Sequence, residues 1–268
     1  MCLDLHPTSM YGRTAYRLAV PLALAIVAMI GTGPFLLKEH RIATVIGLLL
    51  ALGLALVSRS RLAYTNLGLL LAGGGIARMM DSSDWAGVIH ELLGPVALAI
   101  ACAVATLSSR SYEKGSLLLE DSGKPSLSTL TRITPVAIAV QILLGALFRN
   151  GVTGVMPHIA GAIIVGAIIM FAVISVLILP GVVKPLQWTA GSLFGVTFAQ
   201  ILLGIYAYMS KIATAEGNPT TLLSIITVAH IVTGALTIGL SVVLALFVTR
   251  YVRLDAESST SSNVSVAS

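Results

Sequence analysis

The sequence is poor in charged residues, which make up only 10% of its 268 positions, whereas 56% of the positions are hydrophobic. Soluble globular domains carry about 25% charged residues, so an ordinary soluble domain is excluded. The mean hydropathy is +0.96, and the apolar sequence is long enough for eight spans of about 20 residues each. These numbers predict an all-α polytopic membrane protein.

Cysteine is also scarce, since Cys2 and Cys102 are the only two in the chain. A secreted fold held together by several disulfides is therefore excluded. The formal net charge is +5, but the basic residues lie at the ends of apolar runs and do not gather in a patch. That distribution argues against nucleic acid as a partner and favours membrane lipid.

Eight apolar runs separated by charged breaks predict eight transmembrane helices, at about 16–37, 41–58, 62–80, 86–107, 132–150, 155–179, 185–209 and 222–249. The two halves of the chain are similar: Pro21 is followed by LALAI and Pro135 by VAIAV. We therefore predict an internal repeat of two pseudo-symmetric four-helix bundles. The predicted parts are an N-terminal half (13–110), a cytoplasmic linker (111–131), a C-terminal half (132–250) and a Ser-rich disordered tail (251–268).

The distribution of Lys and Arg predicts the orientation of the spans. With the N-terminus placed in the cytoplasm, eleven of the sixteen basic residues lie on the cytoplasmic side. The other five lie outside: Lys38, Arg41, Arg78, Arg149 and Lys211. Because cytoplasmic loops carry the excess of positive charge, both termini are predicted to be cytoplasmic in a multi-pass protein of the cell inner membrane.

Four of the five histidines lie one each on the even-numbered runs, all near the predicted outer end: His40, His90, His158 and His230. A single histidine there has an ordinary explanation, because it stays close to water or bonds a backbone carbonyl. Four at matched depth, two in each half, favour bis-imidazole ligation of haem iron, with one haem per half. Zinc or copper held by these histidines is the weaker alternative, since no Cys or carboxylate cluster completes a four-ligand site.

Three short segments carry a resemblance to a known family. They are Gln141–Arg149 (QILLGALFR), Gln200–Gly204 (QILLG) and the pair His40-Arg41. The first two resemble the QxxLGxxxR stretch of the haem A synthase family of cytochrome oxidase assembly proteins, and the third resembles that family's HR pair. The resemblance extends over most of residues 13–250.

The resemblance implies roles for the histidines. His158 and His230, with Arg149, would bind a b-type haem as cofactor in the C-terminal half. His40 and His90, with Arg41, would hold the substrate haem in the N-terminal half. The implied reaction oxidises a methyl group of haem O to the formyl group of haem A, and the implied partners are haem O synthase and terminal oxidase subunits.

The sequence departs from the family in two respects. The family has a glutamate three residues before the histidine on its second helix, where this chain has Leu37. Glu39 is then the candidate catalytic carboxylate, and Glu91 is a second candidate acid. The long first outer loop of the family is replaced here by a short turn.

Two other functions stay open. The first is a non-catalytic b-type haem protein, used in electron transfer or oxidase assembly. The second is a small-solute permease, because transporters also contain repeats and carry polar residues at the bilayer midplane. Asn66, Gln141 and Gln200 are the deep polar residues that such a permease would use.

Overall fold

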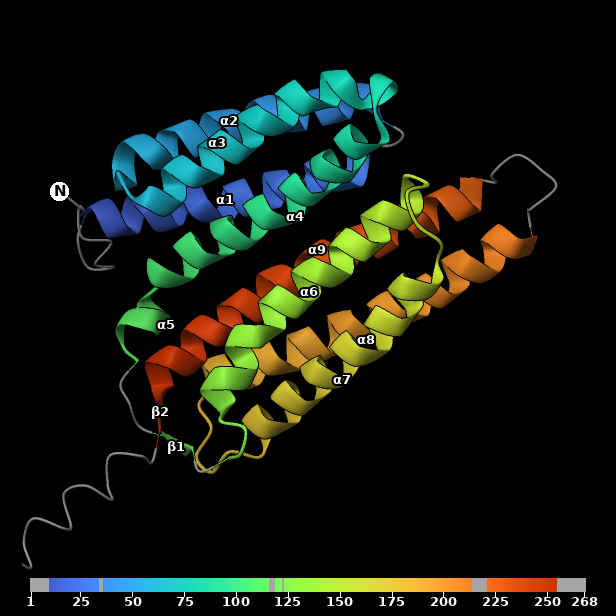
Figure 1. Cartoon of the computed structure of the whole chain (residues 1–268). Helices are drawn as coiled ribbons and strands as arrows, with labels where there is room; N and C mark the ends of the chain where they lie inside the picture. The colour runs from blue at the N-terminus through green and yellow to red at the C-terminus, as the bar shows by residue number, and fades with distance from the viewer. Residues whose placement is uncertain (1–9, 34–35, 116–118, 122, 214–220, 255–268) are drawn as a thin grey trace, which may run out of the picture.

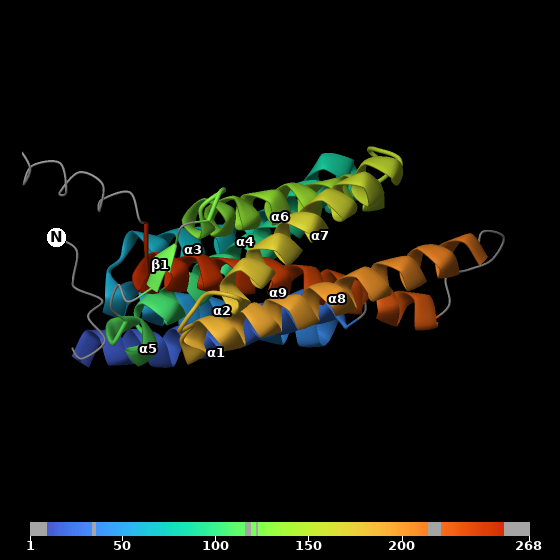
Figure 2. The same cartoon turned by 90° about the horizontal axis from the view of Figure 1, so that it is seen from below.

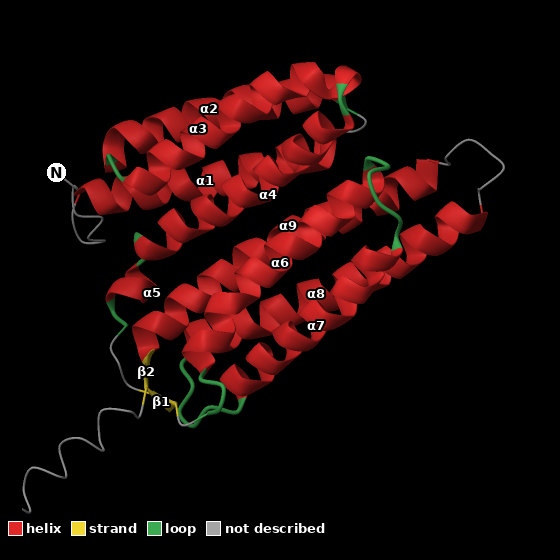
Figure 3. Cartoon of the chain, viewed as in Figure 1, coloured by secondary structure: helices red, strands yellow, loops and turns green. Residues whose placement is uncertain are grey.

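The computed structural model describes residues 10–33, 36–115, 119–121, 123–213 and 221–254. These residues are almost entirely helical (Figure 3). The long helices, in chain order, are α1 (Met10–Thr32), α2 (Leu37–Ser58), α3 (Arg61–Ile76), α4 (Asp84–Leu107), α6 (Leu127–Arg149), α7 (Met156–Leu177), α8 (Lys184–Ala213) and α9 (Thr221–Tyr251). The short elements are a 3₁₀ helix η1 (Ala77–Ser82), α5 (Arg110–Glu113), and the strands β1 (Leu119–Asp121) and β2 (Val252–Leu254).

Seven helices in the described part of the chain are long and apolar enough to cross a membrane, namely α1, α2, α4, α6, α7, α8 and α9. The prediction of an all-α polytopic membrane protein is therefore confirmed, but the predicted count of eight is not. The difference lies in the predicted run 62–80, where α3 has only 16 residues. Its last turn contains Gly73, Gly74 and Gly75. Glycine costs about 1 kcal/mol relative to alanine inside a helix, and the chain continues there as the 3₁₀ helix η1.

The long helices form two groups of four, α1–α4 and α6–α9 (Figure 1). In the first group α1 packs on α2 and α4, and α3 also packs on α2 and α4, so α2 and α4 are diagonally opposite. In the second group α6 packs on α7 and α9, and α8 also packs on α7 and α9, so α7 and α9 are diagonally opposite. The even-numbered predicted runs thus form one diagonal of each bundle.

Helix α9 joins the two groups, because it packs on α4 and α1 as well as on α6 and α8. In Figure 2 it runs through the middle of the molecule. Its contact with α4 is close: a methyl group built on Gly239 would lie 3.1 Å from Cys102 Sγ. Small residues of this kind let membrane helices approach each other without the help of a hydrophobic driving force.

Apolar side chains cover the outside of the bundles as well as their interior. Leu22, Leu98 and Leu244 are at most 1% exposed. On the outer faces, Ile163 is 70% and Trp188 is 75% exposed. Exposed apolar faces of this extent mark contact with another apolar phase, which for these helices is the lipid of the bilayer.

At one end of the molecule, the segment between the two bundles contacts the C-terminal end of α9 and the strand β2 that follows it. The two strands pair in parallel, with Leu119 opposite Val252. The Arg250 guanidinium donates to the carbonyl oxygens of Tyr112 (2.9 Å) and Glu113 (3.0 Å). The predicted linker 111–131 therefore contains ordered elements, and residues 251–254 of the predicted tail belong to α9 and β2; residues 255–268 lie outside the described residues.

Asn66 is a polar side chain in the middle of the N-terminal bundle and is 0% exposed. Its Nδ2 donates to the Ala97 carbonyl oxygen at 2.7 Å, joining α3 to α4. Such bonds between membrane helices contribute about 0.6 kcal/mol on average and up to about 1.7. We expect Asn66→Ala to lower the free energy of unfolding in detergent micelles by about 1 kcal/mol. Exchange of its lipid-facing neighbour, Thr65→Ala, should change it by less than half as much; equal effects would contradict this role.

Candidate functional site

The four predicted site histidines lie near the N-terminal ends of their helices. His40 is in the first turn of α2, His90 in the second turn of α4, His158 in the first turn of α7 and His230 in the third turn of α9. These helices all begin at the same end of the molecule, on the right in Figure 1. All four side chains are half-buried, and all lie within the first three turns of their helices.

In the C-terminal bundle the two histidines meet across the diagonal. The ring centroids of His158 and His230 are 6.2 Å apart, and the ring planes are almost perpendicular, at 86°. A metal ion bonded to one nitrogen of each ring, at about 2.0 Å per bond, would put the two centroids about 6 Å apart. The spacing of the pair therefore suits two axial ligands of one metal centre.

Three of the four histidines are held through Nδ1 by a backbone carbonyl oxygen of the preceding helix. His40 Nδ1 lies 3.0 Å from the Met29 carbonyl oxygen, and His90 Nδ1 lies 3.1 Å from the Gly73 carbonyl oxygen. His230 Nδ1 lies 3.0 Å from the Gln200 carbonyl oxygen. A carbonyl oxygen can only accept, so in the neutral rings of His40, His90 and His230 Nδ1 is the protonated nitrogen and Nε2 keeps its lone pair. Bonds of this kind fix the tautomer and ring orientation of metal-ligating histidines.

The two QILLG segments each support one histidine of the C-terminal pair. Gln141 on α6 donates from Nε2 to the His158 carbonyl oxygen at 2.8 Å, and the same Nε2 lies 3.0 Å from His158 Nδ1. Gln200 on α8 has Nε2 3.4 Å from His230 Nε2, and its Oε1 accepts a hydrogen bond from Thr233. The side chains of both glutamines therefore contact a histidine of the C-terminal pair. The sequence motif alone did not show these contacts.

In three of the four helix hairpins, the residue that bonds the histidine ring is followed four positions later by a glycine. That glycine lies against the same ring. A methyl group built on Gly33 would lie 3.4 Å from His40 Nδ1. One on Gly145 would lie 3.0 Å from His158 Cε1, and one on Gly204 would lie 2.8 Å from His230 Cε1. The 2.8 Å distance at Gly204 is closer than packed atoms approach, so a methyl group there must displace the His230 ring or α8, whereas the 3.0 Å contact at Gly145 is tight and requires a small shift.

The two histidine pairs differ in one respect. The His158 and His230 rings are in edge-to-face contact, whereas no ring contact joins His40 to His90 within the described part of the chain.

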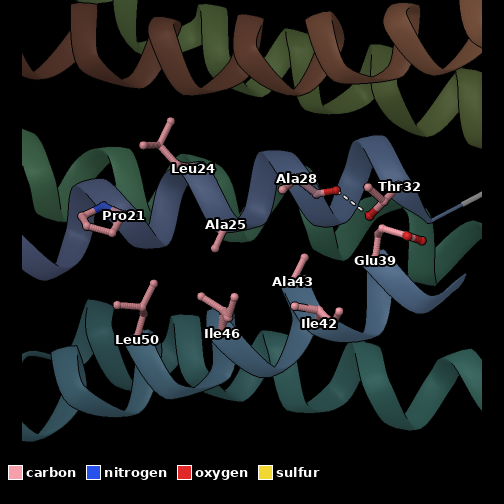
Figure 4. Close-up of a pocket in the computed structure, with 10 residues that line it drawn as sticks. All are labelled: Pro21, Leu24, Ala25, Ala28, Thr32, Glu39, Ile42, Ala43, Ile46 and Leu50. Carbon is pink, nitrogen blue, oxygen red and sulfur yellow. Dashed lines mark hydrogen bonds between the residues drawn. The ribbon is translucent and has the colours of Figure 1, made fainter. Parts of the chain in front are cut away.

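Glu39 lies away from the histidine pairs. It is exposed and lines an apolar groove of about 480 Å³ between α1 and α2, shown in Figure 4. Thr32 is at the same end of this groove and donates to the Ala28 carbonyl oxygen at 2.6 Å. Leu37 is 67% exposed, and Arg41 is also exposed. The predicted catalytic carboxylate is therefore a groove residue, one position from His40 along the helix.

Arg149 and Glu91 form an ion pair between the two bundles. Arg149 Nη2 lies 3.0 Å from Glu91 Oε1, and Asn150 Nδ2 donates to the same oxygen at 3.2 Å. Both charged residues were candidates in the sequence, but neither their pairing nor the hydrogen bond from Asn150 to Glu91 was predicted. The residues are about 60 positions apart, so no local spacing signals the contact.

Comparison of the chain with models of known protein families and with curated proteins finds no match. Within the described residues, no group of three or more His, Cys, Asp and Glu side chains is placed to hold a metal ion. A haem needs fewer protein ligands, because the porphyrin supplies four nitrogens and the protein supplies the axial two. The opposed neutral imidazoles, the glycines against their rings, and the buried Gln141 Oε1, which has no hydrogen-bond partner among the described residues, fit such a group.

Proposed function

We propose that the chain is a haem-binding oxidoreductase of the haem A synthase type, which oxidises the haem O methyl group to the formyl group of haem A. The observation that carries the proposal is the pair His158–His230, with centroids 6.2 Å apart on diagonally opposite helices. Its spacing suits bis-imidazole ligation, and the bond from His230 Nδ1 to the Gln200 carbonyl leaves Nε2 of that ring as the ligating nitrogen.

The proposal includes eight crossings of the cell inner membrane, with both termini in the cytoplasm. Together α3 and η1 are about 36 Å long, from rises of about 1.5 and 2.0 Å per residue, which exceeds the hydrocarbon thickness of about 30 Å. Eleven basic residues then lie inside and five outside. This topology puts all four histidines near the outer surface.

The two bundles have different roles in this proposal. His158 and His230 hold a b-type haem as a resident cofactor, with Arg149 as the cation for its propionates. His40 and His90, whose rings do not touch, hold the substrate haem, with Arg41 as the outer cation. An iron porphyrin at these sites supplies one-electron and oxygen chemistry, and the chain supplies axial nitrogens, orientation and exclusion of water. Haem O synthase and terminal oxidase subunits are the proposed partners.

A second candidate function is favoured by the position of Glu39. This carboxylate is exposed in the groove of α1 and α2 (Figure 4), and Glu91 is already paired with Arg149. A bundle that lacks a free carboxylate at its histidines would bind haem without oxidising it. The second candidate is therefore a b-type haem protein for electron transfer or oxidase assembly.

Co-expression with a source of haem O separates these functions. The purified protein should show a Soret band and a reduced-minus-oxidised spectrum of low-spin haem, and chromatography of the extracted haem should detect haem A. Bound b-type haem without haem A would favour the second candidate. A protein without a Soret band would contradict both and would favour a permease.

A further inference from the structure

The Glu91–Arg149 ion pair joins the two bundles. Glu91 is on α4 in the N-terminal bundle, and Arg149 is the last residue of α6 in the C-terminal bundle. The Glu91 side chain is 19% exposed and the Arg149 side chain is 36% exposed. At this depth the pair is less screened by solvent than a surface ion pair, so its electrostatic effect on nearby groups is larger.

Asn150 makes the contact specific. Its Nδ2 donates to Glu91 Oε1 at 3.2 Å and to the Ala146 carbonyl oxygen at 2.9 Å, which fixes the amide at the end of α6. The same side chain lies against Gly87 on α4, and a methyl group on Gly87 would be 3.0 Å from Asn150 Cγ. We name Glu91, Arg149 and Asn150 the inter-bundle bridge.

The bridge reaches both histidine sites. Glu91 directly follows His90, a residue of the N-terminal pair. Arg149 is the last residue of α6, the helix that packs on both α7 and α9 of the C-terminal pair. Arg149 also follows Gly145 by four residues, and Gly145 lies against the His158 ring; residues four apart share a helix face. One end of the ion pair therefore adjoins His90, and the other end lies on the helix face that carries Gly145, beside His158.

We propose that the inter-bundle bridge is an electrostatic link between the two histidine sites. Glu91 acts in it as a positioning residue that holds Arg149 beside the C-terminal pair and offsets its charge. Because Glu91 adjoins His90 on α4, the helix that carries one N-terminal histidine also supplies the charge that offsets Arg149. The proposal rests on the proposed function for its redox consequence, but the geometry of the bridge does not depend on bound haem.

The geometry is tested first, without haem. In a chain with Cys2 and Cys102 replaced by alanine and a protease site added in the linker 111–131, the pair Gly87→Cys and Asn150→Cys should form a disulfide on mild oxidation. After cleavage the two halves should run together on a non-reducing gel and separate on reduction. A matched pair at exposed positions of the same helices, Asp84→Cys with Val140→Cys, should not cross-link. Failure of the first pair to cross-link would overturn the bridge.

The link is tested by the midpoint potential of the haem bound to His158 and His230. Glu91→Gln leaves Arg149 without a counter-charge, and a positive charge favours the reduced iron. We expect the reduction equilibrium constant to rise about tenfold, which is about 59 mV for a one-electron couple. Arg149→Gln should lower the constant, because it removes the positive charge that Glu91 offsets. Glu120→Gln, an exposed carboxylate on β1, is the matched control and should leave the potential unchanged.

The outcomes separate the bridge from the proposed function. If the wild-type protein shows no Soret band, the proposed function fails, while the disulfide still decides the bridge. If haem binds and Glu91→Gln lowers only thermal stability, with no change in potential, the bridge is a structural clasp and the electrostatic link is refuted. An Arg149→Gln variant with the wild-type potential would also refute it, because Arg149 would then not act on the C-terminal site.

Discussion

Replacing His230 with alanine should abolish the low-spin haem spectrum of the C-terminal bundle. The ring centroids of His230 and His158 are 6.2 Å apart across the diagonal of α7 and α9, so under the proposed function both would bind the same iron. Without His230 the iron keeps one protein ligand, and its affinity and spin state change together. The measurement is the reduced-minus-oxidised spectrum of the purified protein, with the haem content per chain determined in parallel.

A matched control for His230→Ala is His6→Ala, a histidine outside the described residues. It should keep the full spectrum and haem content. His158→Ala should give the same loss as His230→Ala, because the two rings belong to one site. A low-spin spectrum that survives both single substitutions would contradict the assignment of this pair as axial ligands.

Adding one methyl group at Gly204 should have almost as large an effect. The alanine Cβ would lie 2.8 Å from His230 Cε1, which is closer than packed atoms approach, so the ring or α8 must shift. Forced shifts in packed interiors cost about 1–3 kcal/mol. They also rotate His230 away from the Gln200 carbonyl that orients it. We expect Gly204→Ala to reduce haem affinity at least tenfold and to lower the melting temperature.

The control for Gly204→Ala lies on the same helix. A methyl group on Gly195 would meet nothing within 4 Å in the described part of the chain. Gly195→Ala should therefore leave haem affinity and melting temperature close to those of the wild-type protein. Titration of the haem-free proteins with haemin, followed at the Soret band, measures the difference. Equal affinities for the two variants would show that the Gly204 contact does not position His230.

Much of the fold and the identity of the site residues can be predicted from the sequence. An apolar run of about 20 residues is long enough to cross a bilayer as a helix. In lipid the backbone must satisfy its own hydrogen bonds, which leaves helices and closed barrels as the possible structures. The chain class and most helix positions therefore follow from composition. The third run was the exception, because the glycines before Arg78 end α3 early. Histidine is costly within an apolar span, so His40, His90, His158 and His230 were conspicuous in the sequence.

The geometry of the site could not be predicted in the same way. Which histidines oppose each other depends on the order of helices around each bundle, and that order is a tertiary property. The carbonyl oxygens of Met29, Gly73 and Gln200 carry no sequence signature, since every residue has one. A signal was nevertheless available at Gln141 and Gln200, because QILLG occurs twice in the sequence. Each copy precedes one histidine of the C-terminal pair.

The central claim is that each bundle holds its own haem between diagonally opposite histidines. The most direct measurement compares His40→Ala with His158→Ala by reduced-minus-oxidised spectroscopy after expression with both haem b and haem O available. The claim predicts that each substitution removes a different component of the wild-type spectrum and that the double variant retains neither. Loss of the same single component in both variants would contradict it.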